Sequence, residues 1–424
     1  MTTQATIPDD RFRPAAPAAA SRLRQALLLA VALLLVVLYR RPDQFSAPYI
    51  WAEDGVVNIP DFLASGWSSV LHPIAGYFSV PIKLINALAM QLSLRWFPEI
   101  SFVLTLLASY GVLAAVAFSP TRLRWPLLCA LVILFIPTES EVFGVALLIG
   151  WWTSLLALLP LYWNEEGRRP LLRLFLLAVG GLSSPLIVGI APLYVLRAAV
   201  TRRRDDIVTT LAALMLAALQ YQSISRANIV RDAGVSIKLD LIVEKFFGYY
   251  LAVGNNFVQS GLAMYLGLAL IAFIVASWIA HRRELGLTFV LLGGSLGAAI
   301  ASAVLRMPLE VINPAFAAAR YFFFAYVVIG WIIVQLASLD KAGLRLASCA
   351  LLAVAARNGL ENGRRLHAHL DWRAQIDSCL HSPAAYSIPI HTFGGLDQAW
   401  HVDLTAAQCR TLLSRSLFDG EPAP

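Results

Sequence analysis

Long runs of apolar residues constrain this chain more than any other feature of its sequence. The clearest covers residues 23–39, which are nearly all alanine, leucine and valine. About twenty apolar residues are enough for a helix to cross the hydrocarbon core of a bilayer. Further runs predict spans at 99–118, 125–140, 144–163, 170–183, 185–200, 206–222, 260–280, 286–305, 318–337 and 342–357. The sequence therefore predicts an all-α membrane protein, a polytopic bundle of about eleven transmembrane helices.

Composition and charge agree with a place in the membrane. Of the 424 residues, 58% are hydrophobic and 14% are charged, whereas a soluble domain carries about 25% charged residues. The net charge of +7 comes mostly from arginines in loops, such as Arg122, Arg124 and Arg202 to Arg204. These loops all fall on one side if the N-terminus is cytoplasmic, as the positive-inside rule requires. We expect a bacterial inner membrane, a periplasmic C-terminus and no nucleic-acid partner.

The predicted spans divide the chain into three parts. Residues 1–21 lack apolar periodicity and predict a disordered cytoplasmic tail. Residues 22–357 form the transmembrane domain, in which 42–98 is the first periplasmic loop. Residues 358–424 form a small periplasmic C-terminal segment.

Two shorter features modify this topology. Residues 79–94 are apolar, but counting them as a span would place Arg122 outside, so we expect an interfacial amphipathic helix with Lys83 and Asn86 on its polar face. The spans 170–183 and 185–200 are short and meet at Ser183-Ser184-Pro185, which predicts a broken helical hairpin.

The four cysteines show no CxxC spacing, which argues against a zinc or thiol redox motif. Cys129 and Cys349 lie inside apolar runs and are predicted to be core thiols. Cys379 and Cys409 both fall in the periplasmic segment, where oxidation is permitted. A disulfide between them and two unpaired thiols remain equal alternatives, because spacing alone does not fix geometry.

Acidic residues gather at the outer edge of the predicted bundle, and the middle of the spans is essentially free of them. Glu53 and Asp54 follow the first span, where an adjacent pair could supply a general base or bind a cation. The alternative is a solvated helix N-cap at Asp54. Glu139 and Glu141 could share a divalent cation, Mg²⁺ or Mn²⁺, or could mark a hydrated loop.

Basic and aromatic residues lie near the same outer edge. Arg306 and Arg320 flank the loop before span 318–337, where a guanidinium could hold a phosphate or reach to lipid headgroups. Tyr321 begins an aromatic run typical of a membrane interface, which could also form a substrate platform. His72 and Lys83 flank the start of the interfacial helix and are further candidates for substrate binding.

The order of these parts resembles the integral-membrane glycosyltransferases of the C-type fold, which include lipid A aminoarabinose transferases and protein O-mannosyltransferases. In that superfamily an outer loop carries an Asp-Glu pair, followed by an amphipathic helix led by HPP or KPP. Here the acids run Glu53-Asp54, reversed from that order, and one proline follows His72. The resemblance extends to the Glu139 and Glu141 loop, the hairpin at 183–185, and Arg320-Tyr321 opening a late span.

The resemblance implies transfer of a sugar from a polyprenyl-phosphate donor to a periplasmic glycan, glycolipid or protein. Asp54 or Glu53 would be the catalytic carboxylate, and Asp54 is favoured because the superfamily's base is an aspartate. Arg320, assisted by Arg306, would bind the donor's phosphate. The partners would be the bilayer, the donor and a glycan or lipid-linked acceptor. The alternatives are a lipid or small-molecule transporter or flippase, and a non-catalytic membrane scaffold.

Overall fold

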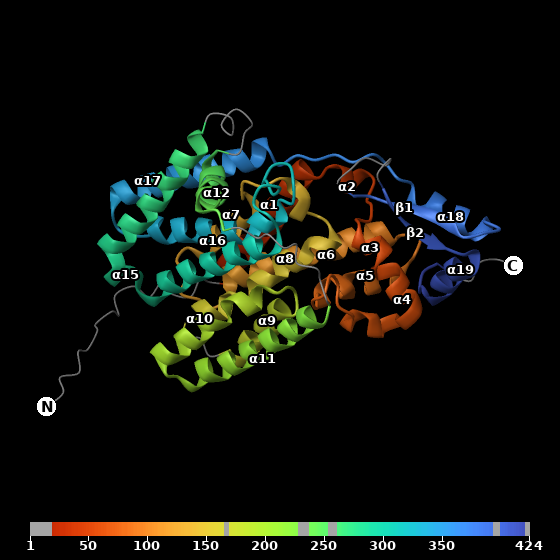
Figure 1. Cartoon of the computed structure of the whole chain (residues 1–424), viewed down its shortest axis with the longest axis horizontal. Helices are drawn as coiled ribbons and strands as arrows, with labels where there is room; N and C mark the ends of the chain where they lie inside the picture. The colour runs from red at the N-terminus through yellow and green to blue at the C-terminus, as the bar shows by residue number, and fades with distance from the viewer. Residues whose placement is uncertain (1–18, 165–168, 228–236, 253–260, 393–398, 420–424) are drawn as a thin grey trace.

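The computed structural model describes residues 19–164, 169–227, 237–252, 261–392 and 399–419. They are mostly helical and form an elongated bundle, with the C-terminal helices and strands at one end (Figure 1). Five described helices are long and apolar enough to cross a membrane, namely α1 (Ala19–Arg40), α6 (Phe97–Phe118), α11 (Arg204–Arg226), α15 (Leu262–Arg306) and α16 (Arg320–Ala337). The chain is therefore a largely helical protein with several helices able to span a bilayer.

Helix α15 contains two of the predicted spans. Its 45 residues would extend about 68 Å as one straight helix, more than twice the thickness of a bilayer core. The backbone leaves the helical region at His281 and again at Gly286, which has a φ of 55°. The break separates two legs that correspond to the predicted spans 260–280 and 286–305.

The predicted helical hairpin is confirmed. Helix α9 (Pro170–Gly181) and helix α10 (Leu186–Thr201) are separated by the short turn that contains Ser183 and Pro185. The hydroxyl of Ser184 accepts a hydrogen bond from the amide of Leu186 at 3.3 Å, which begins the second helix.

Two other predicted spans have the wrong extent. Helix α7 (Pro126–Leu134) ends well before residue 140, and an irregular segment that includes Pro137 follows. Residues 144–163 are broken into α8 (Ile149–Ser154) and the 3₁₀ helices η3 (Ala146–Leu148), η4 (Leu155–Ala157) and η5 (Leu159–Tyr162). Pro160 lacks the amide hydrogen needed to continue a regular α-helix. The residues of this broken segment are mostly buried inside the bundle.

The ends of the predicted transmembrane domain also differ from expectation. Helix α1 begins at Ala19, so the last part of the predicted tail is helical, and residues 1–18 lie outside the described residues. Helix α17 (Ala342–Glu361) continues past the predicted boundary at 357. Cys349 on this helix is exposed, so its prediction as a core thiol is wrong, whereas Cys129 is buried as predicted.

Arg40 and Arg41 at the end of α1 are buried rather than solvated. The guanidinium of Arg40 donates to the carbonyl oxygens of Ile136 at 2.9 Å and Thr138 at 2.7 Å. Arg41 donates to the carbonyl oxygen of Ser140 at 3.2 Å. The two arginines thus hold the irregular segment that carries Glu139 and Glu141.

The C-terminal segment is not all-α, which corrects the predicted fold class. It contains α18 (Trp372–His381), β1 (Tyr386–Ile390), β2 (Trp400–Leu404) and α19 (Ala406–Arg415). The strands pair antiparallel, with Tyr386 opposite Leu404 and Ile390 opposite Trp400. The segment packs against α3 (Glu53–Val56), α4 (Asn58–Ser65) and α5 (Val80–Leu92) at the right-hand end of the molecule in Figure 1. The first loop (residues 42–98) and the C-terminal segment therefore share one hydrophobic core, which is separate from the core of the main bundle.

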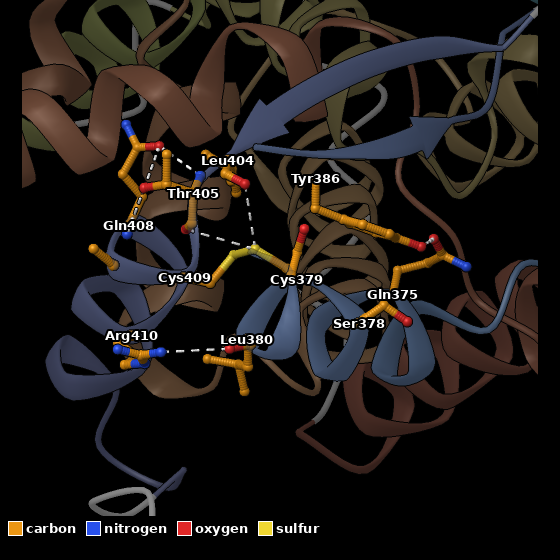
Figure 2. Close-up of a disulfide and its surroundings, with 12 residues drawn as sticks. Gln375, Ser378, Cys379, Leu380, Tyr386, Leu404, Thr405, Gln408, Cys409 and Arg410 are labelled. Atoms are coloured by element: carbon orange, nitrogen blue, oxygen red, sulfur yellow. Dashed lines mark hydrogen bonds between the residues drawn. A yellow bond between two sulfur atoms is a disulfide. The ribbon is translucent and has the colours of Figure 1, made fainter. Parts of the chain in front are cut away.

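The disulfide between Cys379 and Cys409 is present, so that alternative is confirmed. Their Cα atoms are 6.5 Å apart, inside the limit of about 7 Å for a disulfide. Figure 2 shows the bond joining α18 to α19 close to the end of β2.

Replacing both cysteines with serine should weaken the C-terminal segment. The bond closes a loop of 30 residues, so its loss should lower the free energy of opening by about 3–4 kcal/mol. Hydrogen exchange of the amides in α18 and α19 measures this directly. Unchanged protection in the double serine variant would contradict the prediction, and exchange in α16 serves as the internal control.

Candidate functional site

The candidate site begins at the short helix α3, which carries Glu53 and Asp54. Ala52, immediately before it, has a φ of 41° and a ψ of −115°, which is unfavourable for a residue with a Cβ atom. Five described residues other than glycine have a positive φ, and three of them are Ala52, Ala75 and Ala318. These three stand one position before Glu53, two before Tyr77 and two before Arg320, respectively. Strained backbone of this kind gathers where structure is held for function.

Asp54 is buried, with 1% of its surface exposed. One carboxylate oxygen accepts hydrogen bonds from the side chains of Asn86 at 2.7 Å and Asn58 at 3.3 Å. The other accepts from the amide of Leu147 at 2.9 Å. Burial raises the pKa of Asp54 to about 7, although these hydrogen bonds oppose the rise. Asp54 is therefore an anchoring residue in the interior and not a solvated N-cap.

Helix α5 exists where the interfacial helix was predicted, but its polar residues point inward. Asn86 is fully buried against Asp54, and Lys83 is 2% exposed. Lys83 forms an ion pair with Asp61, and His72 Nδ1 lies 3.9 Å from the same carboxylate. The predicted polar face of an interfacial helix is therefore not exposed to water, because Asp61 on α4 covers Lys83 and Asp54 on α3 covers Asn86.

Tyr77 is a residue of the site that sequence reasoning did not single out. It closes a tight turn in which Ala75 and Gly76 both have positive φ values, 48° and 83°, as in a type I′ hairpin turn. The main chains of Ile74 and Tyr77 bond each other at 2.9 and 3.1 Å. The Ala-Gly pair between two apolar residues was the available signal, because glycine favours such a turn.

Four of the predicted residues act electrostatically on Tyr77. Burial raises the pKa of Tyr77, Tyr321 and Glu53 raise it further, and the charges of Arg306 and Arg320 oppose the rise. All four groups thus lie close enough to the tyrosine hydroxyl to act on its charge. Glu53 is partly exposed and Arg306 is exposed, so ligands can reach this group from solvent.

The residues after the Tyr77 turn are held in place by hydrogen bonds to α11 and to the turn between α9 and α10. The side chain of Gln220, on α11, accepts from the amide of Phe78 and donates to its carbonyl oxygen, both at 2.9 Å. Ser79 donates to the carbonyl oxygen of Ser183 at 3.0 Å. The broken hairpin therefore serves as the support on which the turn rests.

Glu139 and Glu141 bind different arginines. The carboxylate of Glu141 accepts from the amide of Arg320 at 3.1 Å and from its guanidinium. Glu139 forms an ion pair with Arg365 at 3.0 Å and caps the amide of Glu141 at 2.9 Å. Over the described ranges, no group of three or more His, Cys, Asp or Glu residues is arranged to hold a metal ion. Each of the two glutamates is therefore paired with a different arginine.

Glu53, Arg306, Arg320 and Tyr321 thus all act electrostatically on Tyr77, and Asp54 anchors the helix that carries Glu53. His72 and Lys83 belong to a separate group around Asp61. No protein-family model matches this chain, and no curated protein or solved structure is significantly similar to it.

Proposed function

We propose that this protein is a membrane glycosyltransferase that moves a sugar from a polyprenyl-phosphate donor to a glycan, glycolipid or protein acceptor. The observation that carries the proposal is that a carboxylate, Glu53, and two guanidiniums, Arg306 and Arg320, all act electrostatically on one tyrosine, Tyr77. Sugar transfer from a phosphate donor needs both kinds of group. A carboxylate takes the proton of the acceptor hydroxyl, and cations stabilise the departing phosphate.

We assign the role of base to Glu53 rather than Asp54. Both oxygens of Asp54 are occupied by donors of the protein, and its side chain is closed off from solvent. Glu53 is partly exposed and acts electrostatically on Tyr77, as the two arginines do. Asp54 then acts as a positioning residue that fixes α3 to α5 and to the segment at Leu147.

The proposed reaction is a single displacement. The acceptor oxygen bonds to the anomeric carbon while its proton passes to Glu53. The bond between that carbon and the phosphate oxygen breaks, and its electron pair leaves with the polyprenyl phosphate. Arg306 and Arg320 neutralise the charge that develops on the phosphate. A lipid-linked donor reaches such a site sideways from the bilayer.

The proposed topology has a cytoplasmic N-terminus and the candidate site on the periplasmic side of a bacterial inner membrane, without the regular crossing predicted at residues 144–163. Two observations support it. The disulfide at Cys379 and Cys409 suits an oxidising compartment. Arg40 and Arg41 would lie on the outer side in this topology. Their guanidiniums donate hydrogen bonds to carbonyl oxygens inside the protein, so they do not act as orientation signals.

A transporter or flippase is the main alternative, and buried ionisable residues inside helices would favour it. Arg173, Arg197 and Asp206 are buried ionisable residues, but they stand near helix ends and not in the middle of the predicted spans. Asp206 bonds to both arginines and to Thr201. Arg197 also donates to the carbonyl oxygens of Leu161 and Trp163. This closed network joins the ends of α9, α10 and α11 and serves to hold them together.

The test is transfer from a radiolabelled polyprenyl-phosphate hexose by membranes that contain the protein. We expect labelled hexose in an acceptor fraction together with release of polyprenyl phosphate. Membranes that contain the Asp205→Asn variant should behave like wild type, because Asp205 is exposed in the first turn of α11. Movement of the labelled donor between leaflets without release of polyprenyl phosphate would establish a flippase. If neither transfer nor movement occurs with any hexose donor, the proposed function is wrong and the scaffold alternative is favoured.

A further inference from the structure

The C-terminal segment contacts the main chain directly before Glu53. The amide of Ala52 donates to the carbonyl oxygen of His391 at 2.8 Å. Trp51 and His391 form an isolated parallel β-bridge. His391 directly follows the last residue of β1, so the end of this strand pairs with the main chain just before Glu53. More than 300 residues of sequence separate these partners.

A second contact joins α3 to β1. A Cβ atom on Gly55 would lie 2.5 Å from Cδ1 and 2.6 Å from Cγ1 of Ile390. Real carbon atoms do not approach so closely, so a larger residue at position 55 requires the side chain of Ile390 to shift. Ile390 itself is fully buried.

A third contact involves the side chain of His391, which is 2% exposed. Its ring lies 4.5 Å from that of Tyr49 and 5.5 Å from that of His367. The hydroxyl of Tyr49 and Nδ1 of His367 are 3.1 Å apart, and the amide of His367 donates to Asp43 at 3.1 Å. The C-terminal segment therefore contacts the first loop on both sides of Trp51, at Tyr49 and at Ala52 and Gly55.

We infer that the C-terminal segment is a positioning element of the candidate site, in which Ile390 and His391 hold α3 so that Glu53 faces the acceptor. Ala52 lies in an unfavourable region of backbone space and keeps that conformation only while its surroundings impose it. The bond to His391 and the Gly55 contact are those surroundings. The inference rests on the proposed function, since it treats Glu53 as the base.

Arg306 and Arg320 come from α15 and α16 and not from the C-terminal segment. Displacing α3 should therefore slow the chemical step without weakening donor binding. A shift of about 1 Å in a reacting group costs on the order of 100-fold in rate. The kinetic signature is a lower kcat with the KM for the donor unchanged.

The experiment uses Gly55→Ala, Ile390→Ala and their combination in the full chain, assayed with the polyprenyl-phosphate hexose that wild type uses. Gly55→Ala should lower kcat by about 10–100-fold and leave the donor KM within about twofold. Adding Ile390→Ala removes the clashing atoms and should restore kcat to the value of Ile390→Ala alone. Ile388→Ala, also buried on β1, is the matched control and should not rescue. Additive losses in the double variant, or full kcat in Gly55→Ala, would overturn the inference.

A second measurement does not depend on sugar transfer. Hydrogen exchange at the amide of Ala52 should be faster in Gly55→Ala and should return toward the Ile390→Ala value in the double variant. Ile390→Ala adds no atoms and must itself raise the exchange, so it serves if Gly55→Ala is not recovered from membranes. If wild type transfers no sugar, the proposed function fails while this measurement still tests the contact. Unchanged exchange at Ala52 in both single variants would refute the positioning role.

Discussion

Glu53→Gln is expected to lower kcat for sugar transfer by about 10²–10⁴-fold, which is the usual contribution of a general base. Glutamine keeps the size and hydrogen-bonding shape of the side chain but cannot take the acceptor's proton. Because Glu53 is partly exposed and forms no anchoring hydrogen bond like those of Asp54, the amount of folded protein should not change. Single-turnover rates at saturating donor separate this loss from any change in binding.

Asp54→Asn is the matched comparison for Glu53→Gln. The three groups that bond to Asp54 are all donors, so an amide nitrogen in its place would oppose one of them. Leaving a buried donor without an acceptor costs about 1–3 kcal/mol of stability. We therefore expect Asp54→Asn to reduce thermal stability and to slow transfer less than Glu53→Gln does. A larger rate loss in Asp54→Asn at unchanged stability would make Asp54 the base.

Several of the helices follow from the sequence, because apolar length and charge position are local properties. The first span, the hairpin at Ser183 to Pro185 and the helix near Lys83 are present as predicted. Glu53, Arg306, Arg320 and Tyr321 were all candidates from the sequence, and all four act electrostatically on Tyr77, whereas the favoured base, Asp54, is closed off in the interior.

The errors arise where hydropathy cannot identify the partner that covers a face. Residues 144–163 are as apolar as a span, but they are short helical pieces buried among other helices. Lys83 and Asn86 are polar and were expected in water, yet their partners Asp61 and Asp54 make burial tolerable. Neither pairing is visible without the three-dimensional arrangement.

The contribution of the C-terminal segment was the least predictable part of the site. The alternation in Tyr386–Ile390 is typical of a half-buried strand, so β1 could have been found. Its contact with Ala52 and Gly55 spans most of the chain and depends on two close approaches that no local pattern encodes. Tyr77 was missed for a related reason, since one tyrosine gains meaning only from the charges folded around it.

Arg320→Ala is expected to destabilise the protein by about 3 kcal/mol, because it leaves the carboxylate of Glu141 buried without a counter-charge. Glu141 has a side chain that is 1% exposed, whereas that of Arg320 is 27% exposed, so we place the loss at the lower end of the range for buried pairs. Thermal unfolding in detergent measures it. Arg345→Gln removes an exposed arginine that pairs with Asp340 and should change stability by less than about 0.5 kcal/mol.

Stability and phosphate binding at Arg320 are separable in a second pair of variants. Arg320→Lys keeps the charge but loses the forked donors, so it should retain folding with partial activity and a raised donor KM. Arg320→Gln combined with Glu141→Gln replaces the ion pair by neutral groups and should recover most of the stability lost in Arg320→Ala. If Arg320 binds the donor's phosphate, this folded double variant still has a donor KM raised by about tenfold or more, because a charge-assisted hydrogen bond to phosphate is worth about 1.5–3 kcal/mol. Wild-type KM in the double variant would mean that Arg320 only neutralises Glu141, and the donor's phosphate would then have to be bound by Arg306.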